Sequence, residues 1–164
     1  MERATQPKKR KVIITGFGLF LLFILAFSLF AYFNFHTIEV SGESMQPTFD
    51  PGKRVMVSKA YWLVGDIKKN DIVVIKRLSD GEILIKRVYA TGGETVDFYN
   101  IPENWSLTEG EYRVPDGEYY LLGDNRPVSE DSRHFGSVTP QEIVGKVIAV
   151  RMGLPSNATA NAKE

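Results

Sequence analysis

Residues 82–89 of the chain read E-I-L-I-K-R-V-Y, an alternating pattern that predicts a β-strand. Successive side chains of a strand point to opposite faces, so Leu84, Lys86 and Val88 share one face and Arg87 lies on the other. A lysine therefore stands between two aliphatic neighbours on a surface that a core would bury. Two interpretations are open. Lys86 either lies on an edge strand and keeps its ammonium in water, or it is desolvated and has a lowered pKa that lets it act as a base.

Similar patterns continue on both sides of this segment. Strands are expected at residues 37–40, 54–58, 71–77, 83–89, 95–99, 118–122 and 143–151. Turn sequences such as Asp50-Pro51-Gly52 and Pro115-Asp116-Gly117 separate them. We also expect one or two helical turns within residues 58–64 and a loop over residues 101–114. This part of the chain is therefore predicted to be mostly β, with an antiparallel sheet.

The chain before these strands is hydrophobic. From Val12 to Phe33, 18 of 22 residues are apolar, and residues 12–35 carry no charge. A helix of that length spans about 33 Å, enough for a hydrocarbon core about 30 Å thick. The alternative is a cleavable secretory signal, whose apolar core is usually about 7–15 residues long and ends in small residues. This run is longer and ends in Tyr32-Phe33-Asn34-Phe35, so residues 12–35 are predicted to be a retained transmembrane anchor.

Charge is distributed unevenly along the chain. Lys and Arg total 20 and Asp and Glu total 20, but residues 1–11 alone carry a net charge of +4. The positive-inside rule then predicts a cytoplasmic N-terminus on a single-pass plasma-membrane protein. Residues 36–154 form the predicted extracytoplasmic β domain, and residues 155–164 a flexible polar tail. The balanced total argues against a nucleic-acid partner, and the absence of cysteine excludes thiol catalysis and cysteine-ligated metals.

Two further segments are rich in polar residues. Residues 41–49 read S-G-E-S-M-Q-P-T-F and residues 123–136 read G-D-N-R-P-V-S-E-D-S-R-H-F-G. Taken singly, such segments are most simply a turn whose serines satisfy backbone groups and a solvated charged loop. With N-D-I-V-V-I at 70–75 and I-K-R-V-Y-A-T-G-G-E at 85–94, however, they follow the order of motifs in the bacterial type I signal peptidases. The chain resembles that family, in its small Gram-positive form, from Lys11 to about Leu154.

The resemblance implies a membrane-anchored serine endopeptidase that removes N-terminal signal peptides from translocated preproteins, cutting after small residues. It implies that Ser44 is the nucleophile and that Lys86, in its neutral form, is the general base. It implies neither a cofactor nor a metal. The supporting residues that it implies are Ser129, which orients Lys86; Gly42 and Met45, in the nucleophile loop; and Asp124, Asp131, Arg87 and Arg133, which form ion pairs.

The oxyanion hole is predicted to use the backbone N–H of Ser44. Some members of the family supply a second donor from a serine two residues before the nucleophile, where this chain has Gly42, so the second donor stays open. His134 is an alternative catalytic base. Trp62 and Phe49 are expected to reach the membrane interface as exposed aromatic residues.

Three functions from different classes stay open. The first is an endopeptidase whose partners are secreted preproteins, the lipid bilayer and the nearby secretion translocon, with the extended substrate added to a sheet edge. The second is a self-cleaving Ser–Lys regulator, although such proteins carry a DNA-binding segment where this chain has an apolar helix. The third is a non-catalytic β module that presents a surface to a partner outside the cell.

Overall fold

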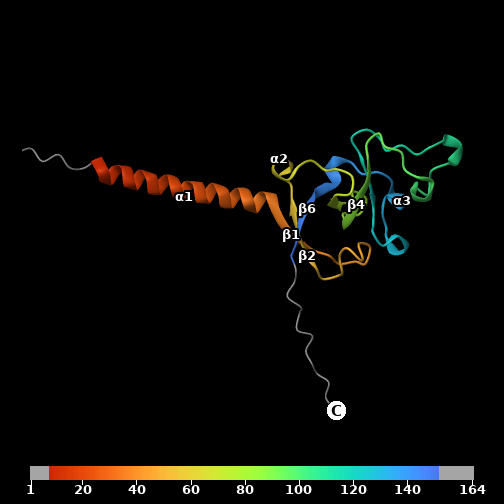
Figure 1. The fold of residues 1–164 in the computed structure, drawn as a ribbon, viewed down its shortest axis with the longest axis horizontal. Helices are drawn as coiled ribbons and strands as arrows, with labels where there is room; N and C mark the ends of the chain where they lie inside the picture. The colour runs from red at the N-terminus through yellow and green to blue at the C-terminus, as the bar shows by residue number, and fades with distance from the viewer. Residues whose placement is uncertain (1–7, 152–164) are drawn as a thin grey trace, which may run out of the picture. The chain divides into compact units, whose positions relative to one another are not determined.

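The computed structural model describes residues 8–151 and divides the chain into one unit up to Phe35 and another from His36 onward (Figure 1). In the first unit, helix α1 runs from Lys8 to Asn34, and its part Gly16–Asn34 is long and apolar enough to cross a membrane. The helix begins inside the predicted N-terminal segment 1–11, so residues 8–11 form its first turn. The rest of that segment, the predicted tail 155–164 and residues 152–154 lie outside the described residues.

The second unit is built on one six-stranded sheet in the order β1-β2-β6-β3-β4-β5. The pairs β2–β6, β6–β3, β3–β4 and β4–β5 are antiparallel, which confirms the predicted fold class. The strands are β1 (Phe35–Glu39), β2 (Arg54–Ser58), β3 (Ile72–Lys76), β4 (Ile83–Thr91), β5 (Tyr119–Leu122) and β6 (Ile143–Arg151).

The predicted strand at residues 95–99 is wrong. Only an isolated bridge joins Thr95 to Arg113, and the next residues form the 3₁₀ helix η1 (Phe98–Asn100). The Asp97 side chain accepts a hydrogen bond from the Tyr99 backbone N–H, a local bond that competes with a strand ladder.

The short helices complete the domain. Helix α2 (Tyr61–Val64) matches the expected helical turn within residues 58–64, whereas α3 (Ser132–Phe135) was not expected from the sequence. The remaining 3₁₀ helices are η2 (Leu107–Glu109), η3 (Arg126–Val128) and η4 (Pro140–Glu142).

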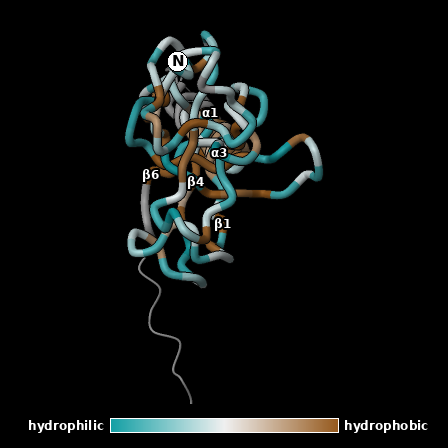
Figure 2. The backbone as a smooth tube through the Cα atoms, turned by 90° about the vertical axis from the view of Figure 1, so that its right-hand side faces the viewer, coloured by the Kyte–Doolittle hydropathy of each residue, from teal (hydrophilic) through white to brown (hydrophobic). Residues whose placement is uncertain are grey.

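Strand β3 lies at the centre of the core. Val73, Val74 and Ile75 are fully buried, so both faces of this strand are covered. Val74 packs into one hydrophobic cluster, while Val73 and Ile75 pack into another that contains Val88 of β4. In Figure 2 the hydrophobic colour gathers around the central strands and the peripheral loops are mostly hydrophilic.

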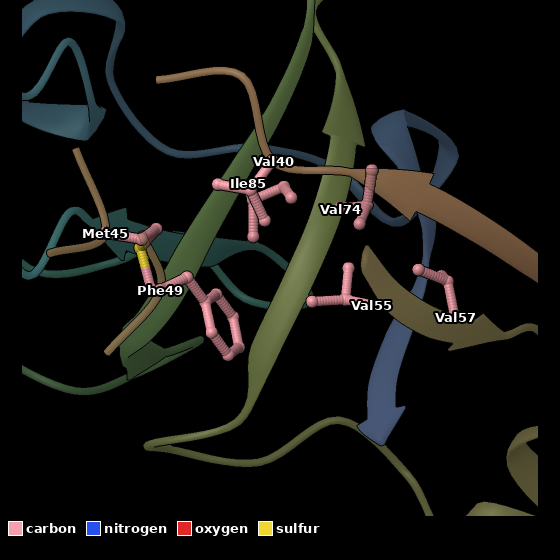
Figure 3. Packing of buried hydrophobic residues seen from close by; sticks show 7 residues of the cluster. All are labelled: Val40, Met45, Phe49, Val55, Val57, Val74 and Ile85. Carbon is pink, nitrogen blue, oxygen red and sulfur yellow. The ribbon is translucent and has the colours of Figure 1, made fainter. Parts of the chain in front are cut away.

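The segment around Ser44 is anchored to this core by its apolar residues. Met45 and Phe49 are buried and pack with Val55, Val74 and Ile85 (Figure 3). The Phe49 N–H donates to the Met45 carbonyl at 2.9 Å, a turn that directs both side chains inward. Phe49 is only 3% exposed, which makes its predicted place at the membrane interface wrong. Trp62, on α2, is 77% exposed.

Candidate active site

Ser44 and Lys86 meet although 42 positions separate them in the chain. Lys86 Nζ and Ser44 Oγ are in hydrogen-bond contact at 2.8 Å. The Lys86 side chain is only 2% exposed, which decides against a solvated edge-strand lysine. Burial lowers the pKa of the Lys86 amine, because removal from water disfavours the charged form. The carboxylates of Asp131, Glu130 and Glu82 oppose this shift, and the Arg77 guanidinium acts in the same direction as burial.

An open edge of β4 makes the contact between Ser44 and Lys86 possible. The pairing of β4 with β5 starts at Arg87, so residues 83–86 have no partner on that side within the described sheet. Leu84 and Val88 pack on one face, as predicted for the face of Lys86, while Ile85 packs with Met45 on the other. The Ser44 loop therefore packs against one face and reaches Lys86 past the open edge.

The Ser44 loop is fastened by the segment that follows β5. The Asn125 backbone N–H donates to the Ser44 carbonyl at 2.9 Å, and Asn125 Nδ2 donates to the Glu43 carbonyl at 3.2 Å. Gly123 provides the space for this approach. A Cβ at that position would lie 2.6 Å from the Ser44 carbonyl oxygen and 2.1 Å from Ser129 Oγ. Only glycine fits between these two groups as they stand.

Arg87 and Asp124 form the first predicted ion pair. Arg87 Nε and Nη2 contact the two carboxylate oxygens of Asp124 at 2.8 and 2.7 Å, a bidentate geometry. Burial alone would raise the pKa of Asp124, but the hydrogen bonds from Arg87 and Thr48 outweigh it and hold the pKa below its usual value. Because the Thr48 hydroxyl also donates to Asp124, this pair ties the end of the Ser44 loop to β4.

Asp131 and Arg133 form the second predicted ion pair. Asp131 is fully buried and accepts hydrogen bonds from Arg133 Nε at 2.9 Å, Arg133 Nη2 at 3.0 Å and the Gly123 N–H at 3.0 Å. Burial acts to raise the pKa of Asp131, but these donors lower it overall, so the buried carboxylate stays ionised. The pair caps α3 and holds Gly123 in place.

Ser129 and His134 are placed differently from their sequence-based roles. Ser129 Oγ is buried but has no hydrogen-bond partner among the described residues, so the expected bond to Lys86 is not formed. The Lys86 amine makes its hydrogen bond to Ser44 instead. His134 closes the capping box of α3 and lies 3.3 Å from Glu103, which gives it a structural role.

A cleft of about 290 Å³ opens beside Ser44. Its lining comprises residues 38–42, Ser44, Met45 and residues 82–85, which include the open edge of β4. A larger hollow of about 390 Å³ lies between residues 95–101 and 110–112 and contains none of the predicted site residues. Ser44, the predicted nucleophile, therefore makes this smaller cleft the candidate substrate site. Gly42 lines it, and a Cβ added there would meet nothing within 4 Å.

Thr48, Gly123 and Asn125 each lie in one of these sequence motifs, but no separate role is predicted for them from the sequence. Thr48 and Asn125 fasten the Ser44 loop, and Gly123 allows the close approach. The signal available in the sequence was Gly123 at the end of the apolar strand pattern 118–122, because a glycine in a strand pattern indicates a bulge or a close backbone approach.

Comparisons with known proteins identify the family to which the chain belongs. The family model described as "Signal peptidase, peptidase S26" matches residues 13–102 and 99–152. Signal peptidase I V of Bacillus subtilis (strain 168) is 33% identical over 137 residues, covering 66% of this chain and 81% of the relative. Signal peptidase I of Bacillus caldolyticus is 33% identical over 143 residues, with coverages of 70% and 78%.

A third sequence relative and a solved structure also match this chain. Signal peptidase IB of Staphylococcus aureus (strain COL) is 31% identical over 140 residues, covering 66% of this chain and 73% of the relative. A crystal structure of a signal peptidase I from Enterococcus faecalis V583 aligns with a TM-score of 0.39 and 26% identity, over 51% of this chain and 97% of that one. The family model and the sequence relatives together show that the chain belongs to the signal peptidase family, peptidase S26, and is a serine endopeptidase.

Proposed function

We propose that this chain cleaves signal peptides from secreted preproteins, with Ser44 as the nucleophile and Lys86 as the general base. The observation that carries the proposal is the 2.8 Å contact between Ser44 Oγ and the amine of a lysine that is 2% exposed. A serine hydroxyl is a weak nucleophile until a base accepts its proton, and a lysine accepts one only when it is neutral. Burial favours that neutral form.

The reaction proceeds in two halves. Lys86 takes the proton of the Ser44 hydroxyl while Oγ attacks the carbonyl carbon, and the resulting ammonium returns the proton to the leaving amine as the peptide bond breaks. In the second half, Lys86 takes a proton from water, whose oxygen attacks the acyl ester and frees the carboxylate. The proton then returns to Ser44 Oγ. The Ser44 N–H, which has no acceptor among the described residues, is available to the oxyanion.

We propose that the substrate binds as an additional strand at the open edge of β4. The Val88 N–H donates to the Asp71 carbonyl and the Glu82 carbonyl accepts from the Arg77 N–H, so the even-numbered residues direct their backbone groups toward β3. In an antiparallel ladder the intervening residues point the other way. Ile83 and Ile85 thus offer their N–H and C=O groups to the cleft, in a position suited to an extended peptide.

The apolar walls of the cleft support a preference for small apolar side chains next to the cut. Val40, Met45, Leu84 and Ile85 line the cleft near Ser44. The cleft has a total volume of about 290 Å³, which must also hold the backbone of the bound peptide. Large side chains at the position before the cut would therefore clash with these walls.

We propose that α1 anchors the enzyme in the plasma membrane with its N-terminus in the cytoplasm. The basic residues at 8–11 stand in the first helical turn, next to the apolar part, where the positive-inside rule places cytoplasmic charge. The domain from residue 36 onward then lies outside, near the translocon that delivers preproteins. Protease added to intact cells should remove this domain and leave an N-terminal fragment protected.

The decisive experiment is cleavage of a purified preprotein in detergent by the full chain and by Ser44→Ala, Lys86→Ala and His134→Ala variants. We expect the first two variants to fold but lose activity by at least about a thousand-fold, and the third to stay active. N-terminal sequencing of the product should place the cut after a small residue. If the Ser44→Ala variant still cleaves the preprotein, Ser44 and Lys86 are not the catalytic pair. If the unmodified chain does not cleave it, a non-catalytic β module is favoured. Self-shortening without action on other chains would favour a self-cleaving regulator.

A further inference from the structure

Arg77 makes an unusual set of contacts in the turn between β3 and β4. Its guanidinium forms ion pairs with three carboxylates, those of Asp80, Glu82 and Glu130, although its side chain is only 14% exposed. It also lies over the ring of Phe135 in α3, 5.9 Å from the ring centroid. The Arg77 backbone N–H donates to the Glu82 carbonyl at 2.9 Å, and this hydrogen bond closes the turn.

Two of these carboxylates come from different segments of the chain, and both favour the charged form of Lys86. Glu82 lines the substrate cleft and directly precedes Ile83, whose backbone faces the open edge of β4. Glu130 directly follows Ser129 in the segment after β5. The Arg77 side chain therefore joins the wall of the cleft to the segment that carries Ser129 and Glu130.

The charges around Lys86 come from two elements. The β3–β4 turn contributes Glu82 and Arg77, and the segment after β5 contributes Glu130 and Asp131. Asp131 is neutralised by its own partner Arg133, whereas Glu82 and Glu130 share the single guanidinium of Arg77. Ser44 and Ser129, the remaining polar neighbours discussed above, carry no charge.

We propose that Arg77 is a positioning residue for the reaction: it holds the β3–β4 turn against the segment carrying Ser129, and its charge offsets the carboxylates of Glu82 and Glu130 near Lys86. This inference rests on the proposed function, because it assigns Arg77 a role relative to Lys86 as the base. Without Arg77, the uncompensated carboxylates would favour the ammonium form of Lys86, which cannot accept the Ser44 proton.

The test compares pH profiles of kcat/KM for the full-length chain in detergent, with a purified preprotein as substrate. Arg77→Gln should move the acid limb to higher pH by about half a unit, a roughly three-fold loss of rate on that limb. Glu130→Gln should move it to lower pH, because it removes a carboxylate that favours the ammonium. The double variant should return close to the unmodified profile. If the two single variants shift the acid limb in opposite directions and the double variant restores it, Arg77 acts through its charge. Loss of structure would lower the activity without these opposite shifts.

The matched control is Lys69→Gln, which breaks an exposed ion pair, at 3.2 Å, between Lys69 before β3 and Glu94 after the end of β4. Its acid limb should not move. The Arg77→Gln shift should shrink in about 1 M salt, because the carboxylates are half exposed and screened. Unmoved limbs in Arg77→Gln and Glu130→Gln, with Ser44→Ala and Lys86→Ala inactive, would overturn the role of Arg77 alone. Activity in those two alanine variants would instead overturn the proposed function.

Discussion

At Lys86, the property needed for activity lowers the stability of the fold. A buried amine serves as a base because it is neutral, but keeping it neutral lowers the stability of the fold wherever the unfolded chain would be protonated. A shift of one pKa unit corresponds to about 1.4 kcal/mol. In the proposed mechanism this loss of stability falls at the position where the Ser44 hydroxyl, 2.8 Å away, needs a proton acceptor.

The conflict predicts that Lys86→Met stabilises the protein while abolishing cleavage. The pKa of Lys86 is lowered in the fold, so between that value and about 10.4 the unfolded state binds more protons and stability rises with pH. Methionine removes this dependence. The melting temperature of Lys86→Met should exceed that of the unmodified chain by a few degrees near pH 7, with the difference shrinking toward pH 10.

Thermal denaturation between pH 6 and pH 10 measures this difference. The control for the loss of a lysine ammonium is Lys59→Met, at an exposed lysine next to β2. A difference for Lys86→Met that grew with pH would show that the lysine is charged in the fold.

Gly42 offers a second prediction at the scale of one residue. A Cβ there meets nothing within 4 Å, and the residue lines the cleft two positions before Ser44. Gly42→Ser should therefore fold normally and add a hydroxyl donor beside the developing oxyanion. We expect kcat to rise several-fold at unchanged KM, because the donor acts on the transition state. Steady-state kinetics measure both constants, and a lower kcat would contradict the prediction.

Among the elements, the segment after β5 controls the position of the nucleophile. Its Asn125 hydrogen-bonds to the Ser44 loop, and its Asp124 forms an ion pair with Arg87 of β4. Asp131 accepts a hydrogen bond from the Gly123 N–H and so holds the start of the segment. All three contacts depend on the backbone passing close to Ser44 at Gly123. The short strand β5 ends just before this point, which leaves the edge of β4 open for substrate.

Gly123→Ala should therefore misplace the nucleophile. The new Cβ would stand 2.6 Å from the Ser44 carbonyl oxygen, a backbone atom that cannot rotate away. We expect a loss of stability of about 1–3 kcal/mol and a loss of activity of at least about a hundred-fold. Denaturant unfolding and preprotein cleavage measure the two effects. Gly42→Ala is the matched control for stability, since its Cβ meets no neighbour, and equal stability of the two variants would contradict the prediction.

At the scale of the whole molecule, the anchor and the catalytic unit are separable. The three buried hydrophobic clusters lie entirely between residues 38 and 147, so a chain starting at His36 retains the whole core. The contribution we propose for the anchor is to hold the site at the membrane surface in which the substrates are embedded, which raises their effective concentration.

A fragment of residues 36–164 should fold and cleave a soluble peptide with nearly the kcat of the full chain. Its kcat/KM for a preprotein in lipid vesicles should fall by at least ten-fold, because the shared bilayer no longer concentrates enzyme and substrate. Parallel assays with peptide and vesicle substrates measure the ratio. Equal losses on both substrates would mean that the helix supports the fold instead.

Much of the fold follows from local patterns. Strands β2 and β6 occupy the predicted residues, and the other strands except that at 95–99 are found with ends shifted by a few residues. The exception has a local cause, the Asp97 side chain, which captures a backbone N–H that a strand would use. Likewise α3 depends on the capping box of Asp131 and His134, a short-range signal set inside a segment that otherwise has the composition of a loop.

The amino-acid sequence alone identifies the apolar helix, the alternating strands, the motifs and Lys86 on an aliphatic face, because these depend on neighbours along the chain. The contact between Ser44 and Lys86, the burial of Phe49, the unpartnered Ser129 hydroxyl and the charge network of Arg77 depend on how distant segments pack. Such packing is set by the sum of many weak contacts over the whole core, so no single segment encodes it. The catalytic arrangement therefore belongs to the tertiary structure, while the residues that form it are already visible in the sequence.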